Sequence, residues 1–327
     1  MKKHSIALAC LLLALAAQSK AEETKSIAAQ TIDTLNGLSG GPHAGMRANH
    51  AKGVMATGSF KPSAEAASIS KAAHFKESVD VTVRFSTGTG VPMIPDANPN
   101  SRPYGMAVRF NLPKGGFTDF VGISYDGFPV STPEDFLGLL NAVATIGKST
   151  EKPAPIEKFL GTHPAALAFV QAPKPAPASF GTQSYFGVNA FEFTNAQGVK
   201  RFGRYRIVPV AGNEFLSEEE AAKRGNDFLM EELPARLEQG EVSFKVLLQL
   251  ADKSDVVNDA SIVWPKERAI VELGTLTLSK PVANGKQEEK ALAFNPLILP
   301  DGISPSSDPI LLARPLAYAV SVGQRSK

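Results

Sequence analysis

An arginine and a tyrosine four residues apart near the C-terminus are the strongest candidates for chemistry in this sequence. Side chains at positions i and i+4 of a helix are neighbours, so a helix here would place Arg314 beside the phenol of Tyr318. A neighbouring guanidinium favours the phenolate, which is an anionic metal ligand and one of the known axial ligands of haem iron. The pair predicts such a site, with a surface pair or an ordinary core tyrosine as the alternative.

A histidine near the start of the chain is the second candidate. His50 lies in a segment of small residues and glycines, from Met46 to Ser59. This composition lets a backbone approach a flat group, or forms a bulged strand edge. A neutral imidazole there is suited to moving protons, and the alternative is a hydrogen-bonded structural histidine.

The elements that must position these residues are strands, with helices inserted between some of them. Alternating β-branched residues predict strands, one of which carries Arg84 between apolar neighbours. Capping residues such as Thr132 and Ser217 predict helix starts. The predicted class is α+β, with an antiparallel β-barrel of about eight strands and with inserted and C-terminal helices. The predicted strands are 79–87, 105–112, 118–124, 185–193, 198–209, 242–251 and 268–278, and the helices are 132–146, 156–170, 217–237 and the C-terminal segment.

The first 21 residues have the pattern of a cleavable secretory signal. A basic start precedes an apolar run over 6–17, and Ser19-Lys20-Ala21 is a small-residue cleavage site. We therefore expect residues 1–21 to be a signal peptide, 22–40 an N-terminal arm and 41–327 a single domain. The expected location is the periplasm.

Composition excludes several classes of function. The chain has 327 residues, 43% of them hydrophobic and 20% charged, as is usual for a globular protein with a sizeable core. Its one cysteine, Cys10, lies in the predicted signal, so thiolate chemistry and disulfides are excluded from the remainder. The signal also holds three lysines and no acid, so the formal charge of +2 becomes −1 without it. This leaves no basic bias for nucleic acid or an anionic membrane.

Four segments, in order, resemble the haem catalases. The resemblance spans about residues 41–325 and is greatest to the short exported members, the catalase-related peroxidases, which lack the long C-terminal part of true catalases. The matching segments are Arg47–Gly53, Val83–Thr87, Ser101–Phe110 and the stretch from Ala293 to Tyr318.

The resemblance implies roles for individual residues. Tyr318 would be the proximal iron ligand, and Arg314 would hold it ionised. His50 would be the distal acid–base residue, oriented by a hydrogen bond from Ser86. These types suit peroxide cleavage, which needs a proton shuttle and an anionic axial ligand. Three arginines, Arg47, Arg84 and Arg325, match those that pair with haem propionates, and Phe294 matches a phenylalanine packed near the haem.

The sequence departs from the family where catalases bind and admit peroxide. Catalases have Val-Gly-Asn-Asn where this chain has Val121-Gly122-Ile123-Ser124, so Ser124 is the nearest polar substitute for the asparagine beside the histidine. Gly88 stands where catalases have a channel valine, and Arg102 lies near their channel aspartate. We expect these changes to weaken disproportionation of hydrogen peroxide and to widen the route for organic reductants.

The expected function is that of a haem-dependent peroxidase with weak catalase activity. It would reduce hydrogen peroxide or organic peroxides with a small-molecule electron donor, using haem and no NADPH, because the segment linked to that nucleotide is missing. We expect no nucleic-acid or membrane partner, and a monomer or homodimer because the arm is short. The alternatives are a periplasmic haem-binding protein with little turnover, a hydroperoxide isomerase, and a barrel that no longer binds haem.

Overall fold

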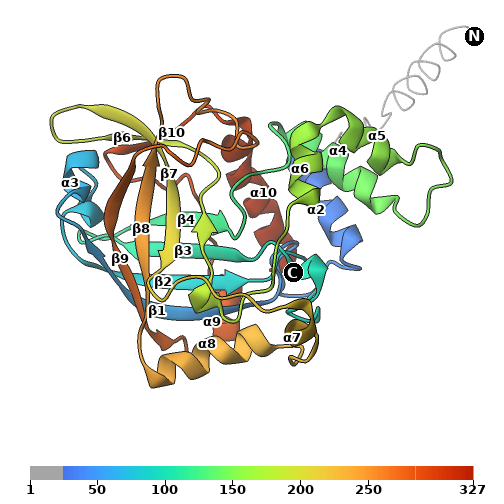
Figure 1. The fold of residues 1–327 in the computed structure, drawn as a ribbon, viewed down its shortest axis with the longest axis horizontal. Coiled ribbons are helices and arrows are strands. Elements are labelled where there is room, and N and C mark those ends of the chain that lie inside the picture. The colour runs from blue at the N-terminus through green and yellow to red at the C-terminus, as the bar shows by residue number, and fades with distance from the viewer. Residues whose placement is uncertain (1–24, 284, 327) are drawn as a thin grey trace, which may run out of the picture.

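A closed eight-stranded antiparallel barrel forms the body of the computed structural model, which describes residues 25–283 and 285–326 (Figure 1). The predicted signal peptide lies outside these residues. Neighbouring strands run β1-β2-β3-β4-β5-β7-β8-β9, and β9 pairs with β1 to close the ring. The predicted barrel is thus confirmed. The strands are β1 (Gly53–Pro62), β2 (Val79–Ser86), β3 (Gly105–Asn111), β4 (Phe117–Ile123), β5 (Tyr185–Phe186), β7 (Lys200–Pro209), β8 (Val242–Leu250) and β9 (Ile270–Pro281), with β6 (Phe191–Thr194) and β10 (Ile303–Pro305) extending the sheet beside β7.

The glycine-rich segment after His50 is strand β1. Its register against β9 shifts between Thr57 and Gly58, which is the bulge that its composition indicated. A Cβ at Gly58 would lie 1.9 Å from the carbonyl oxygen of Thr277, so only glycine allows this close approach. Aromatic side chains such as Phe85 and Phe244 fill the core.

A group of helices packs on one side of the barrel (Figure 1). Helix α2 packs against α4 and α10, so the segment expected to be an arm contains a helix. The predicted helix over 156–170 is two helices, because the first ends before His163 and Pro164 begins the second. The predicted helix over 217–237 is also two, with Pro234 inside the second. The helices are α2 (Ile27–Leu38), α4 (Pro133–Ala144), α5 (Pro155–Thr162), α6 (Pro164–Gln171), α7 (Glu218–Ala222), α8 (Phe228–Gln239), α9 (Gly285–Ala291) and α10 (Pro309–Arg325), with the short α3 (Ala66–Ile69) at the far side of the barrel.

Helix α10 lies between the barrel and this helical group (Figure 1). Asp308 is its N-cap, and Pro309 is its first helical residue. The Asp308 side chain accepts a hydrogen bond from the backbone N–H of Ile310 at 2.9 Å. Burial of Ile310 and Leu311 fixes the first turn against the core. The cap therefore sets where the later residues of the helix lie. Within the part of the chain that the structure describes, no helix has the length and apolar character needed to cross a membrane.

Candidate functional site

A cavity of about 480 Å³ lies between the barrel and helices α2, α4 and α10. This volume is in the range of sites that hold a cofactor or drug-sized ligand. Its lining brings together all of the predicted site residues except Ser124, namely Arg47, His50, Arg84, Ser86, Phe294, Arg314, Tyr318 and Arg325.

On the helix side, Arg314 and Tyr318 lie together as their spacing predicts. Nε and Nη2 of Arg314 donate to the Tyr318 hydroxyl oxygen at 3.0 and 2.8 Å. The third guanidinium nitrogen, Nη1, donates to Oδ1 of Asn189 at 2.8 Å. Nδ2 of Asn189 in turn donates to a carboxylate oxygen of Asp308 at 2.8 Å. Asp308, the N-cap of α10, thus also helps to orient Arg314 towards Tyr318, because Asn189 links the two side chains.

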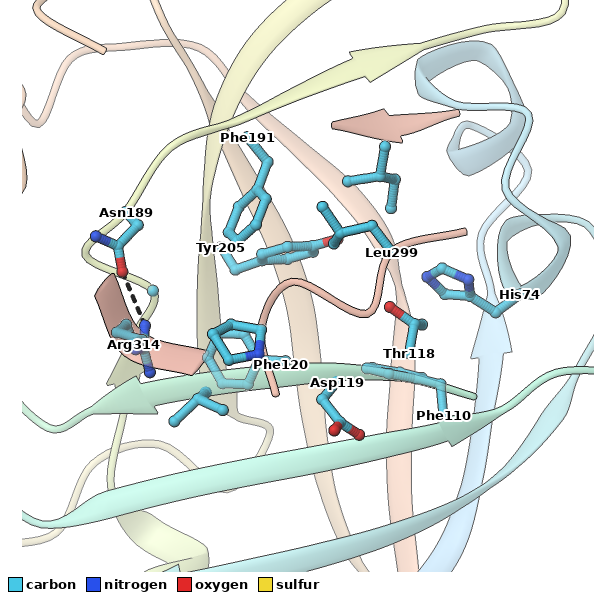
Figure 2. Close-up of a pocket in the computed structure, with 14 residues that line it drawn as sticks. His74, Phe110, Thr118, Asp119, Phe120, Asn189, Phe191, Tyr205, Leu299 and Arg314 are labelled. Carbon is cyan, nitrogen blue, oxygen red and sulfur yellow. Dashed lines mark hydrogen bonds between the residues drawn. The ribbon is translucent and has the colours of Figure 1, made fainter. Parts of the chain in front are cut away.

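Arg314 and Asn189 also form part of the wall of a second, much smaller cavity, of about 20 Å³, inside the barrel (Figure 2). That volume suits a single water molecule. His74 lies across this small cavity from the arginine, and burial lowers the pKa of His74 to about 3. The ring of His74 is therefore neutral and belongs to the core.

On the barrel side, His50 is held in a left-handed backbone conformation with φ of 56°. Nη2 of Arg84 donates to the His50 carbonyl oxygen at 2.8 Å, which secures this conformation. The Ser86 hydroxyl lies 3.1 Å from Nδ1 of the ring. Burial and then the charge of Arg84 lower the pKa of His50 to about 4. The imidazole is therefore neutral at physiological pH and available as a base.

Three guanidiniums gather at one end of the cavity. Burial, together with the neighbouring charges of Arg84 and Arg325, lowers the pKa of Arg47 to about 8. Nη2 of Arg325 donates to the carbonyl oxygen of Leu292 at 3.0 Å, and its Nε is buried without a hydrogen-bond partner among the described residues. Such a cluster is suited to binding an anionic group.

The structure does not place Ser124 in the cavity. Its hydroxyl accepts from the backbone N–H of Tyr104 at 3.0 Å, and its own N–H donates to the Tyr104 carbonyl oxygen. Side chains alternate across a strand, so Ile123, one residue earlier, faces the cavity instead. The expected polar substitute for the family's asparagine is thus replaced by an apolar side chain.

Gly88 does not line the cavity either, so the structure gives no support for a widened route at this position. A Cβ at Gly88 would lie 2.3 Å from the carbonyl oxygen of Pro103. The glycine is therefore required by the close approach of two backbone segments. Arg102 is likewise away from the cavity and donates to the carbonyl oxygens of Lys174 and Ala97.

Sequence reasoning missed Asn189 and Gly105, both of which line the cavity. A Cβ at Gly105 would lie 2.7 Å from the Ser86 hydroxyl and 2.8 Å from Nδ1 of His50. Gly105 lies inside a segment that resembles the family, but nothing in the sequence signals its contact with His50 or the contact of Asn189 with Arg314.

Comparison with known proteins places this architecture in one family. The family model described as Catalase matches residues 43–326. A catalase-related peroxidase of Mycolicibacterium paratuberculosis is 39% identical, covering 91% of this chain and 94% of the relative. Another, of Synechococcus elongatus, is 32% identical and covers 91% and 88%.

Solved structures agree on the fold. Catalase A from Saccharomyces cerevisiae superposes with a TM-score of 0.76 at 23% identity, over 90% of this chain and 64% of that one. A bacterial catalase superposes with a TM-score of 0.75 at 24% identity, over 87% and 58%. With the barrel and the match over residues 43–326 together, the chain belongs to the catalase family.

Proposed function

We propose that this protein is an exported, haem-dependent peroxidase that reduces hydrogen peroxide or organic peroxides with a small-molecule electron donor. Family membership and the two relatives named as catalase-related peroxidases make it a peroxide-acting oxidoreductase. The observation that carries the haem proposal is a single cavity bounded by His50 and by a tyrosine bonded twice to Arg314. The predicted signal over residues 1–21 supports export to the periplasm.

The residues present fit a haem. Tyr318 would hold the iron, because it lines the cavity and its oxygen accepts two hydrogen bonds from a guanidinium. The arginine cluster would hold the two propionates, and the buried Nε of Arg325 is a donor left for such an oxygen. The haem would supply the redox chemistry.

His50 would move the proton in this reaction. Its ring is neutral because its pKa is lowered to about 4, so it can accept a proton from the incoming peroxide and return it to the departing oxygen. Ser86 holds the ring through Nδ1. The strained backbone of His50, secured by Arg84, fixes the ring relative to the cavity.

An apolar cavity wall supports weak catalase activity and acceptance of organic peroxides. Ile123, Phe128 and Phe136 are apolar side chains of the cavity lining and offer hydrogen peroxide no hydrogen bond. With His50 as the main polar partner for peroxide, an alkyl hydroperoxide gains apolar contacts that hydrogen peroxide lacks.

The optical spectrum of the purified protein with added haemin tests this proposal. A high-spin ferric spectrum of the tyrosinate type, lost in Tyr318→Phe, is expected. An unchanged spectrum in Tyr318→Phe, or no haem uptake, would contradict it.

Turnover separates the proposal from its alternatives. Replacing His50 with alanine in the haem-loaded protein should lower peroxidase turnover by about 10²–10⁴-fold. Rates no better than free haemin in the unaltered protein would instead indicate a haem-binding protein. Conversion of a lipid hydroperoxide without an electron donor would indicate an isomerase.

A further inference from the structure

The segment after strand β9 supplies a carboxylate to the arginine cluster. Oε1 of Glu289 accepts from Nε of Arg84 at 2.6 Å and from Nη1 of Arg47 at 3.1 Å. Only 4% of the Arg84 side chain and 14% of the Glu289 side chain are exposed. A single oxygen thus bridges two largely buried guanidiniums, which is a strong form of ion pair.

The backbone of the same segment binds the cluster as well. Nη2 of Arg47 donates to the carbonyl oxygens of Leu292, at 2.7 Å, and Glu289, at 3.3 Å. Nη2 of Arg325 donates to the same Leu292 oxygen at 3.0 Å. Residues 289–292 therefore contact all three arginines.

Glu289 is not part of the cavity lining, whereas Arg47, Arg84 and Arg325 all are. A guanidinium has donors along several edges, so one carboxylate can bind it from behind while another approaches from the cavity. Glu289 thus leaves the cavity side of the cluster open to a ligand.

The charges explain why a carboxylate is needed there. Three guanidiniums that are buried together repel one another, and Arg84 and Arg325 contribute to the lowered pKa of Arg47. Glu289 acts in the opposite direction, because its charge raises the pKa of both Arg47 and Arg84. With Glu289 the cluster carries two net positive charges, which balance the two negative charges of the haem propionates.

We propose that Glu289 is a built-in counter-charge of the haem carboxylate site, which keeps the arginine cluster charged and in place before the cofactor binds and weakens the hold on the propionates by like-charge repulsion. This rests on the proposed haem function. Helix α9, which carries Glu289 and packs against β1, is then a functional part of the site. The role of Glu289 is positioning, because it acts on the haem through the arginines.

The test compares haem with its dimethyl ester, in which the two carboxylates are uncharged. Affinity for each is measured by absorbance titration with the unaltered protein, Glu289→Gln and Glu288→Gln. Glu288 is on the same helix and is exposed, so its variant makes the same charge change away from the cluster. Glutamine keeps the shape of Glu289 and removes the charge.

The ratio of affinities for haem and for the ester should rise about tenfold in Glu289→Gln, because a like charge near the propionates is removed. The ratio should stay unchanged in Glu288→Gln. Disorder in the rest of the cavity affects both ligands equally and cancels in the ratio, whereas displaced arginines would lower the ratio. The haem-free form of Glu289→Gln should also unfold at a lower temperature than that of Glu288→Gln.

An unchanged ratio, or a fall, in Glu289→Gln would overturn the inference, and so would a rise of the same size in Glu288→Gln. Equal unfolding temperatures of the two haem-free variants would overturn the part concerning the haem-free protein. Failure of the unaltered protein to bind haem would instead contradict the proposed function, so the two failures are distinguishable.

Discussion

Gly105 and His50 approach so closely that position 105 has no room for a side chain. A Cβ there would lie 2.8 Å from Nδ1 of His50 and 2.7 Å from the hydroxyl of Ser86. Gly105 begins strand β3, His50 precedes β1, and Ser86 ends β2, the strand that pairs with both. The positions of His50 and Ser86 therefore depend on the absence of a Cβ at position 105.

Gly105→Ala should therefore lower turnover without preventing haem uptake. The added methyl displaces His50 or Ser86, and a displacement of about 1 Å at a catalytic group costs on the order of 10²-fold. Haem titration and peroxidase kinetics check this. Gly161→Ala is the control, because a Cβ at Gly161 meets nothing within 4 Å. Normal turnover in Gly105→Ala would show that His50 is not held by this contact.

The pH dependence of activity should report the buried environment of His50. Its pKa is lowered from 6.5 to about 4, mainly by burial. In the proposed function the neutral ring is the proton acceptor, so the acid limb of kcat/KM should lie near pH 4. A limb near pH 6.5 would mean that the ring is solvated.

Stability should depend on pH over a related window. Between pH 6.5 and about 4 the unfolded chain protonates His50 and the folded chain does not. The unfolded state therefore binds more protons there, so the contribution of His50 is complete above pH 6.5 and is lost as the pH falls towards 4. His74, with a pKa lowered to about 3, adds a slope of the same sign. Unfolding temperatures of His50→Gln across this range should fall less steeply with acid than those of the unaltered protein.

Asn189 should influence the environment of the Tyr318 oxygen indirectly, through Arg314. It accepts from Arg314 and donates to Asp308, so Asn189→Leu would release Arg314 from one of its two anchors. Loss of such an outer partner typically costs 10–100-fold in affinity or activity. We expect a shifted ferric spectrum together with weaker haem binding. The matched control is Asn100→Ala at an exposed site, and equal spectra for the two variants would contradict the role of Asn189.

Ile123 should influence which peroxide is preferred. Ile123→Asn places a hydrogen-bond donor on the cavity wall, which favours hydrogen peroxide over an alkyl hydroperoxide. The ratio of kcat/KM for the two peroxides should change by about tenfold in that direction. Ile123→Val changes the volume without adding a polar group and should leave the ratio near its original value. An equal change in both variants would mean that space, and not polarity, sets the preference.

The barrel and the pairing of Arg314 with Tyr318 could be predicted from the sequence because their signals are local, whereas the other expected site residues came from the resemblance to haem catalases. Alternation along strand β2 and the spacing of Arg314 and Tyr318 are read within a few residues. Helix α2 was less evident, because packing against α4 and α10 stabilises it more than its own composition does. Asn189, Gly105 and Glu289 act through contacts between segments far apart in the chain, for which one sequence carries no signal. Ser124 was expected in the site, but it lies just beyond the end of β4, and Ile123, whose side chain points the other way, lines the cavity.

The two sides of the cavity come from opposite ends of the described chain. His50 precedes the first barrel strand, and Tyr318 lies on the last helix. During synthesis, a nascent chain that has not yet reached α10 contains His50, two of the cluster arginines and the barrel strands. It lacks Tyr318 and Arg325. Under the proposed function, capture of the cofactor would therefore be one of the last steps of maturation, and a bound haem would link the start of the barrel to α10.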